Sequence, residues 1–144
     1  MKKKIVFGLV FIVLLSTWLC ACNKRTSISE EYSQKSYIVI ENTVMDRLIS
    51  IGITRYIGDV AVGSTGMANA DNSIIKDKFL EFECQREDFP VDSDLQEFAI
   101  QISVTEDNGI TYDLEKLNIP LTFGKDIFLE LTYEDGHYGI RRTE

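Results

Sequence analysis

The clearest periodic pattern in this 144-residue chain is Phe98-Ala99-Ile100-Gln101-Ile102-Ser103-Val104-Thr105. Phe98, Ile100, Ile102 and Val104 recur at every second position, and polar side chains follow Ile100, Ile102 and Val104. A period of two places alternate side chains on opposite faces of a β-strand, so that one face can be buried while the other meets water. The segment therefore predicts a half-buried strand and excludes an amphipathic helix.

The same alternation recurs on both sides of this segment and predicts seven or eight strands, the eighth being 59–64. We expect them at 36–41, 48–57, 59–64, 78–86, 97–105, 109–114, 125–133 and 137–142. An Asn-Gly pair at 108–109 and an Asp-Gly pair at 135–136 predict hairpins. We expect a type I′ turn at 108–109, in which both central residues have positive φ.

Short strands with one apolar face, separated by turn residues, predict an all-β fold. We expect an antiparallel β-sandwich of two packed sheets over residues 36–144. A small β-barrel is the alternative. The sandwich is Ig-like in architecture only, because the single Trp, Trp18, precedes the domain and no cysteine pair accompanies it.

Composition limits the classes of function. The chain is 44% hydrophobic and 26% charged, which is typical of one globular domain. Its 23 acidic and 15 basic residues give a formal charge of −8, which argues against a nucleic-acid partner. Three cysteines and one histidine exclude a disulfide scaffold and a multi-histidine metal site. We therefore expect no cofactor and assign no metal site; a calcium ion held by turn oxygens at one end of the sandwich is left open as an alternative.

The first 22 residues have the pattern of an export signal. Lys2-Lys3-Lys4 precede an apolar run over 5–15, and Leu19-Cys20-Ala21-Cys22 follow. The apolar run is shorter than the roughly 20 residues that a membrane-spanning helix needs. A basic start, a short apolar segment and a small residue before the cleavage point are typical of a secretory signal peptide. The quartet ending at Cys22 resembles a bacterial lipobox.

The lipobox resemblance implies that Cys22 receives a diacylglycerol thioether and becomes the first residue of the mature chain. Cys20 is the competing acceptor, but the bulky Leu19 before it suits a cleavage pocket poorly. An uncleaved signal anchor and an ordinary secreted protein are the other interpretations. The resemblance implies a signal peptide at 1–21 and a lipidated cysteine at 22. The polar, Ser-rich composition that follows predicts a flexible tether, so that the lipidated cysteine and tether span 22–35.

The order of lipobox, polar tether and acidic β-domain resembles that of small uncharacterised lipoproteins of Firmicutes. The stretch 70–79, followed by strands, is similar to a loop-and-strand pattern in such proteins. The resemblance implies a protein that acylated Cys22 holds in the bilayer on the extracytoplasmic face of the cell membrane. It carries no catalytic motif.

Side chains suited to catalysis are scarce. His137 directly follows a predicted turn, where no second group orients it as a general base. Cys84 lies on the apolar face of its strand, where a thiol is unreactive. Asp92-Ser93-Asp94 lacks the glycine and the distal glutamate of a calcium-binding loop. We expect a protein that is not an enzyme, with a carboxylate-based hydrolase as a weaker alternative.

The segment 63–73 is long, small and polar, and it matches neither a P-loop nor a dinucleotide-binding loop. It is either a flexible connection or a recognition loop presented by the rigid sandwich. The candidate binding residues are Gly63, Ser64, Thr65, Gly66, Met67, Asn69, Asp71 and Asn72.

These patterns predict a non-enzymatic binding or accessory domain for another extracytoplasmic molecule. An inhibitor or immunity-type lipoprotein that acts on a cationic protein or peptide is the alternative. An acidic surface accelerates association with such a partner and makes it sensitive to salt. The sequence does not determine the oligomeric state or the ligand.

Overall fold

The computed structural model describes residues 34–143. These residues belong to one compact unit that begins at Gln34. The predicted signal peptide, the lipidation site Cys22 and most of the predicted tether lie outside the described residues.

The described part of the chain consists almost entirely of strands and short connections. Its strands are β1 (Lys35–Asn42), β2 (Leu48–Ile57), β3 (Val60–Ala68), β4 (Phe79–Gln85), β5 (Phe98–Glu106), β6 (Thr111–Asp113), β7 (Leu117–Asn118), β8 (Ile127–Glu134) and β9 (His137–Arg142). Two short 3-10 helices, η1 (Arg86–Asp88) and η2 (Leu95–Glu97), lie between β4 and β5. No helix among residues 34–143 is long and apolar enough to cross a bilayer.

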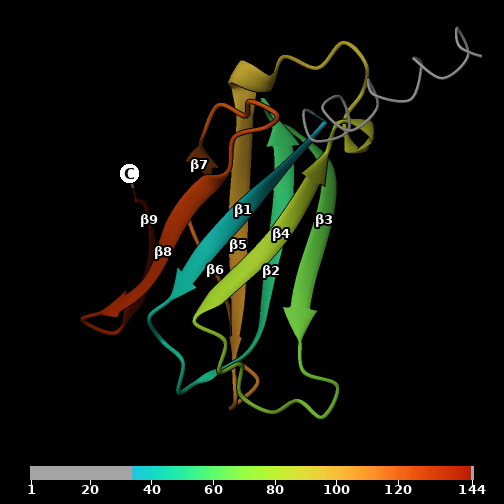
Figure 1. Ribbon diagram of the computed structural model, residues 1–144. Coiled ribbons are helices and arrows are strands. Elements are labelled where there is room, and N and C mark those ends of the chain that lie inside the picture. Colours follow the sequence, from blue (N-terminus) through green and yellow to red (C-terminus); the bar gives the residue numbers. More distant parts are fainter. Residues whose placement is uncertain (1–33, 144) are drawn as a thin grey trace, which may run out of the picture. The chain divides into compact units, whose positions relative to one another are not determined.

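The strands form two separate sheets. One has the order β4-β1-β8-β9, and the other has the order β3-β2-β5-β6, with β7 pairing a further part of β5. All pairs are antiparallel except β1 with β8, which run in the same direction. Figure 1 shows β1 and β4 of the first sheet crossing in front of β5 and β2 of the second. The predicted all-β sandwich is confirmed, and the small closed barrel is wrong.

The core lies between the two sheets. In β5 the alternate residues Phe98, Ile100, Ile102 and Val104 are each at most 1% exposed, as the sequence pattern predicts. Ile38 and Ile40 of β1 and the alternate residues of β8 bury their side chains from the facing sheet. Each such side chain contributes about 1.5–3 kcal/mol when it leaves water, so this alternation is the main source of stability.

The residues of two hairpin turns determine the backbone conformation of each turn. Asp135 and Gly136 both have positive φ, as a tight turn between β8 and β9 requires. At the predicted 108–109 turn only Gly109 has positive φ, so the type I′ prediction is wrong there. The connection is one residue longer, because Glu106 bonds to Ile110 and Gly109 bonds back to Glu106 through their backbones. The Asn108 side chain accepts the Ile110 N–H and holds this wider turn.

Candidate functional site

The predicted recognition loop divides into a strand and a turn. Gly63, Ser64, Thr65, Gly66 and Met67 all lie in β3, which continues to Ala68. The prediction of a loop that begins at residue 63 is therefore wrong, and the predicted strand at 59–64 ends four residues too early. The reason is that small residues carry no hydrophobic alternation, while the neighbouring β2 offers a full ladder of backbone hydrogen bonds.

The remaining candidates, Asn69, Asp71 and Asn72, form a self-contained turn. The Asn69 side-chain amide donates to Ser73 and Ile74, and the Asp71 carboxylate accepts the Ser73 N–H at 3.0 Å. Hydrogen bonds from Ser73 hold the pKa of Asp71 below its ordinary value. Asn72 has a φ of 55°, which asparagine tolerates better than most residues. These side chains are occupied in shaping the chain after β3.

The register with β2 assigns the two faces of β3. Met67 and Thr65 lie opposite Ile51 and Ile53, which are buried, so these positions face the interior of the sandwich. Ser64 and Gly66 occupy the alternate positions and face outward. The structure therefore divides the candidate residues of β3 between two faces.

β3 is an edge strand that carries no charged residue and no proline, and its only protective irregularity is one bulge in its pairing with β2. Its only neighbour in the sheet is β2, and its nine residues include no Lys, Arg, Asp, Glu or Pro. No backbone group elsewhere in residues 34–143 bonds to its open side. Edge strands usually carry charges, prolines or bulges because their unpaired N–H and C=O groups attract other strands. β3 shows one irregularity of register, between Arg55 and Tyr56 of its neighbour.

The other three edges are protected. β4 carries Glu81 and Glu83, β9 carries His137, Arg141 and Arg142, and β6 has only three residues. Long uncharged backbone is thus available on β3 alone among the edges of the described sandwich.

A buried arginine lies behind the middle of β3. Arg55 of β2 is 9% exposed, and its Nη1 lies 2.7 Å from the Oδ2 of Asp88 in η1. A Cβ on Gly63 would lie 3.1 Å from the guanidinium, so this glycine leaves the room that Arg55 needs. Nε of Arg55 is buried and has no hydrogen-bond partner among the described residues. The ion pair joins the five-stranded sheet to the segment that follows β4.

The environment of Asp88 favours its charged form. Burial raises the pKa of this carboxyl, but hydrogen bonds from the Gln85 N–H and from Arg55 outweigh burial, so the pKa lies below its ordinary value. The patterns in the sequence did not single out Arg55. The available signal was a cation on the apolar face of the predicted strand 48–57, where only a paired charge is tolerated.

A second polar cluster joins the other side of the sandwich, where β6 and β9 are the edges. The Tyr138 hydroxyl donates to Glu106 at 2.7 Å, and Arg47 and Asn108 also bond to this carboxylate. The Arg47 guanidinium lies 4.2 Å from the centre of the Tyr133 ring. These bonds, with that of Tyr138 foremost, hold the pKa of Glu106 below its ordinary value despite its desolvation.

The remaining candidates for chemistry are dispersed. His137 is exposed, and its Nδ1 lies 3.0 Å from the Asp135 carbonyl of its own turn. Cys84 is 1% exposed, and burial raises the pKa of its thiol. Asp94 accepts the Gln96 N–H at the start of η2. Within residues 34–143 no three His, Cys, Asp or Glu side chains are placed to hold a metal ion.

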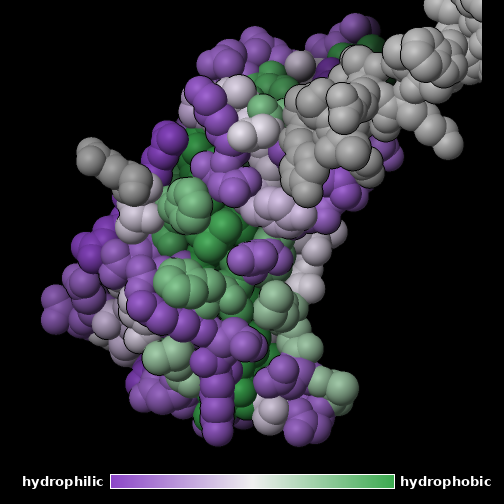
Figure 2. All heavy atoms as spheres, in the orientation of Figure 1, coloured by the Kyte–Doolittle hydropathy of each residue, from purple (hydrophilic) through white to green (hydrophobic). Residues whose placement is uncertain are grey.

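An apolar area lies on the outer face of the four-stranded sheet. Phe79 and Phe128 are about half exposed there, at 53% and 47%. With Val39 and three other residues they line a shallow hollow of about 120 Å³. Figure 2 shows apolar side chains in the middle of this face, with hydrophilic side chains around them. Lys78 and Glu41 form an ion pair beside the hollow, 3.1 Å apart.

Comparisons of the chain with protein-family models, with curated proteins and with solved structures found no match.

Proposed function

We propose that this protein is a lipid-anchored, extracytoplasmic binding module that is not an enzyme. It takes up an extended segment of a partner as an additional strand beside β3. The observation that carries the proposal is the nine-residue edge of β3, which has no charge, no proline and no backbone partner on its open side in the described structure.

Strand addition suits this edge for a physical reason. An extended segment gains a row of backbone hydrogen bonds when it lies beside an exposed edge, and alternate side-chain positions provide specificity. Gly63, Ser64 and Gly66 have little or no side chain, so they leave the backbone accessible. A strand with larger or charged side chains would make the approach less favourable.

The edge is also held in place before a partner arrives. β3 pairs with β2 from Val60 to Ala68, and Arg55 and Asp88 bond directly behind Gly63. A preorganised site loses less conformational entropy on binding than a flexible loop does. This supports a recognition surface on β3 in place of the loop that the sequence suggested.

The proposed location at the membrane depends on the pattern of residues 1–22. The lipobox quartet that ends at Cys22 supports lipidation, and several acyl chains give stable anchoring where one is marginal. A binding role is supported by the exposed turn position of His137 and by the burial of Cys84, which leave neither well placed as a base or a nucleophile.

An inhibitor or immunity-type role is the second candidate. Residues 34–143 contain 20 acidic and 10 basic residues, and this surplus favours a cationic protein or peptide as the partner. Both candidates use the same edge, and they differ in what binding does to the partner.

Proline substitutions test the edge. Consecutive N–H groups of β3 point alternately toward β2 and away from it, so one of Ser64→Pro and Thr65→Pro keeps the ladder with β2. That variant should keep nearly the wild-type melting temperature and lose the partner. In full-length protein in its own membrane, a photo-cross-linking residue at Ser64 should give a discrete adduct that the tolerated proline abolishes.

The matched control for the cross-link is Thr111, an exposed position on β6 at the opposite edge of the same sheet. Identical adducts from Ser64 and Thr111, or none from Ser64, would contradict strand addition at β3.

The anchor has its own test. Cys22→Ala should abolish labelling by a radioactive fatty acid and release the protein from the membrane fraction or leave the precursor uncleaved. Cys20→Ala is the matched control and should keep both the label and the membrane location. If the label were lost in Cys20→Ala and kept in Cys22→Ala, the lipid would be on Cys20, and the assignment of Cys22 would be contradicted.

A further inference from the structure

We infer that the segment taken up by β3 is basic and alternates apolar with cationic side chains. This inference rests on the proposed strand addition and names the chemistry of the partner. It follows from the two faces of β3 and from the charges around its ends.

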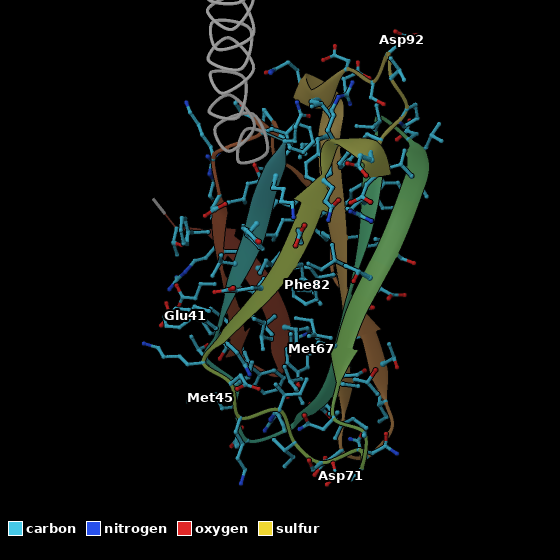
Figure 3. The ribbon with its side chains drawn as sticks, turned by 45° about the vertical axis from the view of Figure 1, so that its right-hand side comes forward. Glu41, Met45, Met67, Asp71, Phe82 and Asp92 are labelled. Atoms are coloured by element: carbon cyan, nitrogen blue, oxygen red, sulfur yellow. The ribbon has the colours of Figure 1, made fainter. Side chains whose placement is uncertain are left out.

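The inward face of β3 requires apolar side chains in the partner. Met67 and Val62 are partly buried and pack against the core. Figure 3 shows Met67 of β3 and Phe82 of β4 directed toward the space between the two sheets. An added strand would place its inward side chains beside those of β3, at the margin of the core. Apolar side chains there would remove further apolar surface from water.

The outward face of β3 accommodates long side chains. Ser64 and Gly66 alternate there with no bulky or charged neighbour on the same strand. Cross-strand neighbours on one face of a sheet lie about 5 Å apart. Long outward side chains of the partner can therefore lie along β3 and reach the groups at its ends.

Those groups are carboxylates. Asp71 follows β3 at one end, and Asp92 and Glu97 belong to the connection near the other end, where the Glu97 carbonyl accepts the Gly58 N–H. None of these three carboxylates forms an ion pair within residues 34–143. Figure 3 shows Asp71 and Asp92 at opposite ends of the domain, Asp71 beyond the end of β3 and Asp92 at the end of the domain where β3 begins.

β3 itself carries no basic residue, and the cations nearest to it are few: Arg55 behind Gly63, Lys76 after the turn that follows β3, and Arg86 beside the 90–91 connection. The stretch 58–75 contains no Lys or Arg, and Asp59 at the start of β3 already pairs with Lys116. With 20 acidic and 10 basic residues over 34–143, acidic side chains still outnumber basic ones in the domain that carries this edge, so the field around the edge is negative on balance. Such a field attracts a basic segment and repels an acidic one, most strongly at low salt.

The same charges disfavour a second copy of this chain as the occupant. β3 pairing with β3 of another copy would place two domains side by side, each with twice as many acidic as basic residues. The net negative charges of two adjacent domains repel each other. A foreign basic segment meets no such penalty.

The test uses full-length protein in vesicles of zwitterionic phosphatidylcholine and three nine-residue peptides. The first alternates Val and Lys, the second alternates Val and Glu, and the third is the first with alternate backbone nitrogens methylated. At about 50 mM salt we expect the Val/Lys peptide to bind at least about tenfold more tightly than the Val/Glu peptide, and to weaken at about 500 mM. It should slow hydrogen exchange of β3 amides, and methylation should abolish this effect.

A pair of variants on one residue sharpens the test. Ser64→Lys should weaken binding of the Val/Lys peptide, and Ser64→Glu should strengthen it, by about twofold to fivefold each. Both changes lie on the exposed outer face, so the fold should be retained.

The outcomes separate the two claims. Equal binding of the Val/Lys and Val/Glu peptides, both sensitive to backbone methylation, would overturn the basic partner and keep strand addition. Binding that methylation leaves unchanged, or no protection of β3 by any peptide, would overturn strand addition itself. A concentration-dependent dimer that protects β3 without peptide would show that a second copy is the occupant.

Discussion

The two open sides of this sandwich are joined in different ways. Between β6 and β9, the Tyr112 and Tyr138 rings lie 5.3 Å apart, and Tyr138 bonds to Glu106. Between β3 and β4, one ion pair of Arg55 with Asp88 joins the sheets, and β3 itself carries only small or uncharged side chains. One side is closed by aromatic and charged side chains, while the other leaves a strand edge accessible.

The difference shows how a sandwich can keep one edge accessible while its core stays intact. Aromatic pairs add about 0.5–1.5 kcal/mol beyond their burial and need no backbone from a partner. A buried ion pair contributes little net stability because desolvation opposes it, but it fixes geometry. Side-chain contacts therefore join the two sheets on the β6–β9 side, and β3 keeps unpaired backbone groups along its open edge, which the proposed strand addition would use.

The largest expected effect concerns the core that both sides share. Ile102→Ala should lower the free energy of unfolding by about 2–5 kcal/mol, because Ile102 is 1% exposed and a cavity would remain. Denaturant titration measures the change, and Ser103→Ala on the outer face should cost well under 1 kcal/mol. Hydrogen exchange in Ile102→Ala should accelerate equally in β3 and β9. Faster exchange in β3 alone would show that the two sides do not share one core.

The next effect concerns the ion pair on the β3–β4 side. Asp88→Ala should cost about 3 kcal/mol, because it leaves the buried Arg55 without its carboxylate. Arg55→Met should cost about 1 kcal/mol or less, since Asp88 is partly exposed and water can solvate it. Asp88→Asn keeps an acceptor for the Gln85 N–H and isolates the loss of charge. A larger cost for Arg55→Met than for Asp88→Ala would contradict this account.

A smaller effect, dependent on pH, is expected on the β6–β9 side. The pKa of Glu106 lies below its ordinary value of 4.5, so its contribution to stability is present above that pH and is lost as the pH falls through the lower value. Tyr138→Phe removes the principal hydrogen bond and should lower the melting temperature at pH 7. The difference from wild type should disappear in acid.

Tyr112→Phe is the control for this prediction, because no hydrogen bond of the Tyr112 hydroxyl is present within the described residues. It should leave the acid part of the stability profile unchanged. Parallel profiles of wild type and Tyr138→Phe at every pH would show that Glu106 does not depend on Tyr138.

The smallest signal is expected from Cys84. Its thiol is buried and burial raises its pKa, so native protein should resist alkylation and react only on unfolding. The charges of Arg55 and Asp88 both influence the pKa of this thiol, so the reactivity of Cys84 indicates whether the β3–β4 side has opened. Alkylation, followed by mass spectrometry, should accelerate at least about tenfold in Asp88→Ala and little in Tyr138→Phe. Equal acceleration in both would mean that the sides open together.

Much of the fold could be predicted from the sequence because the alternation of apolar residues in a strand indicates which of its faces is buried. The alternation of apolar residues over 98–105 corresponds directly to the buried face of β5, and the Asp-Gly pair at 135–136 corresponds to its hairpin. These signals are local: each depends only on neighbouring residues and on the two-residue period of a strand. The quartet at 19–22 is equally local, and the predicted lipobox depends on neighbouring residues alone.

The site could be predicted only in part. The stretch 63–73 stood out because it is small and polar, but the same composition concealed that 63–68 continue β3. Its strand character comes from hydrogen bonds to β2, and Gly, Ser and Ala contribute no alternation that would show it. Whether β3 has an open edge depends on the order of strands in the sheet, which no local pattern contains.

The sequence by itself determined the all-β class and the buried faces of the main strands. Only the tertiary structure decided that Arg55 meets Asp88, 33 residues away, and that Tyr138 meets Glu106, 32 residues away. Local patterns carry over into structure because the period of a strand acts within a few residues. Contacts across the sandwich arise when two sheets pack, and packing brings together residues whose separation in sequence gives no sign of it.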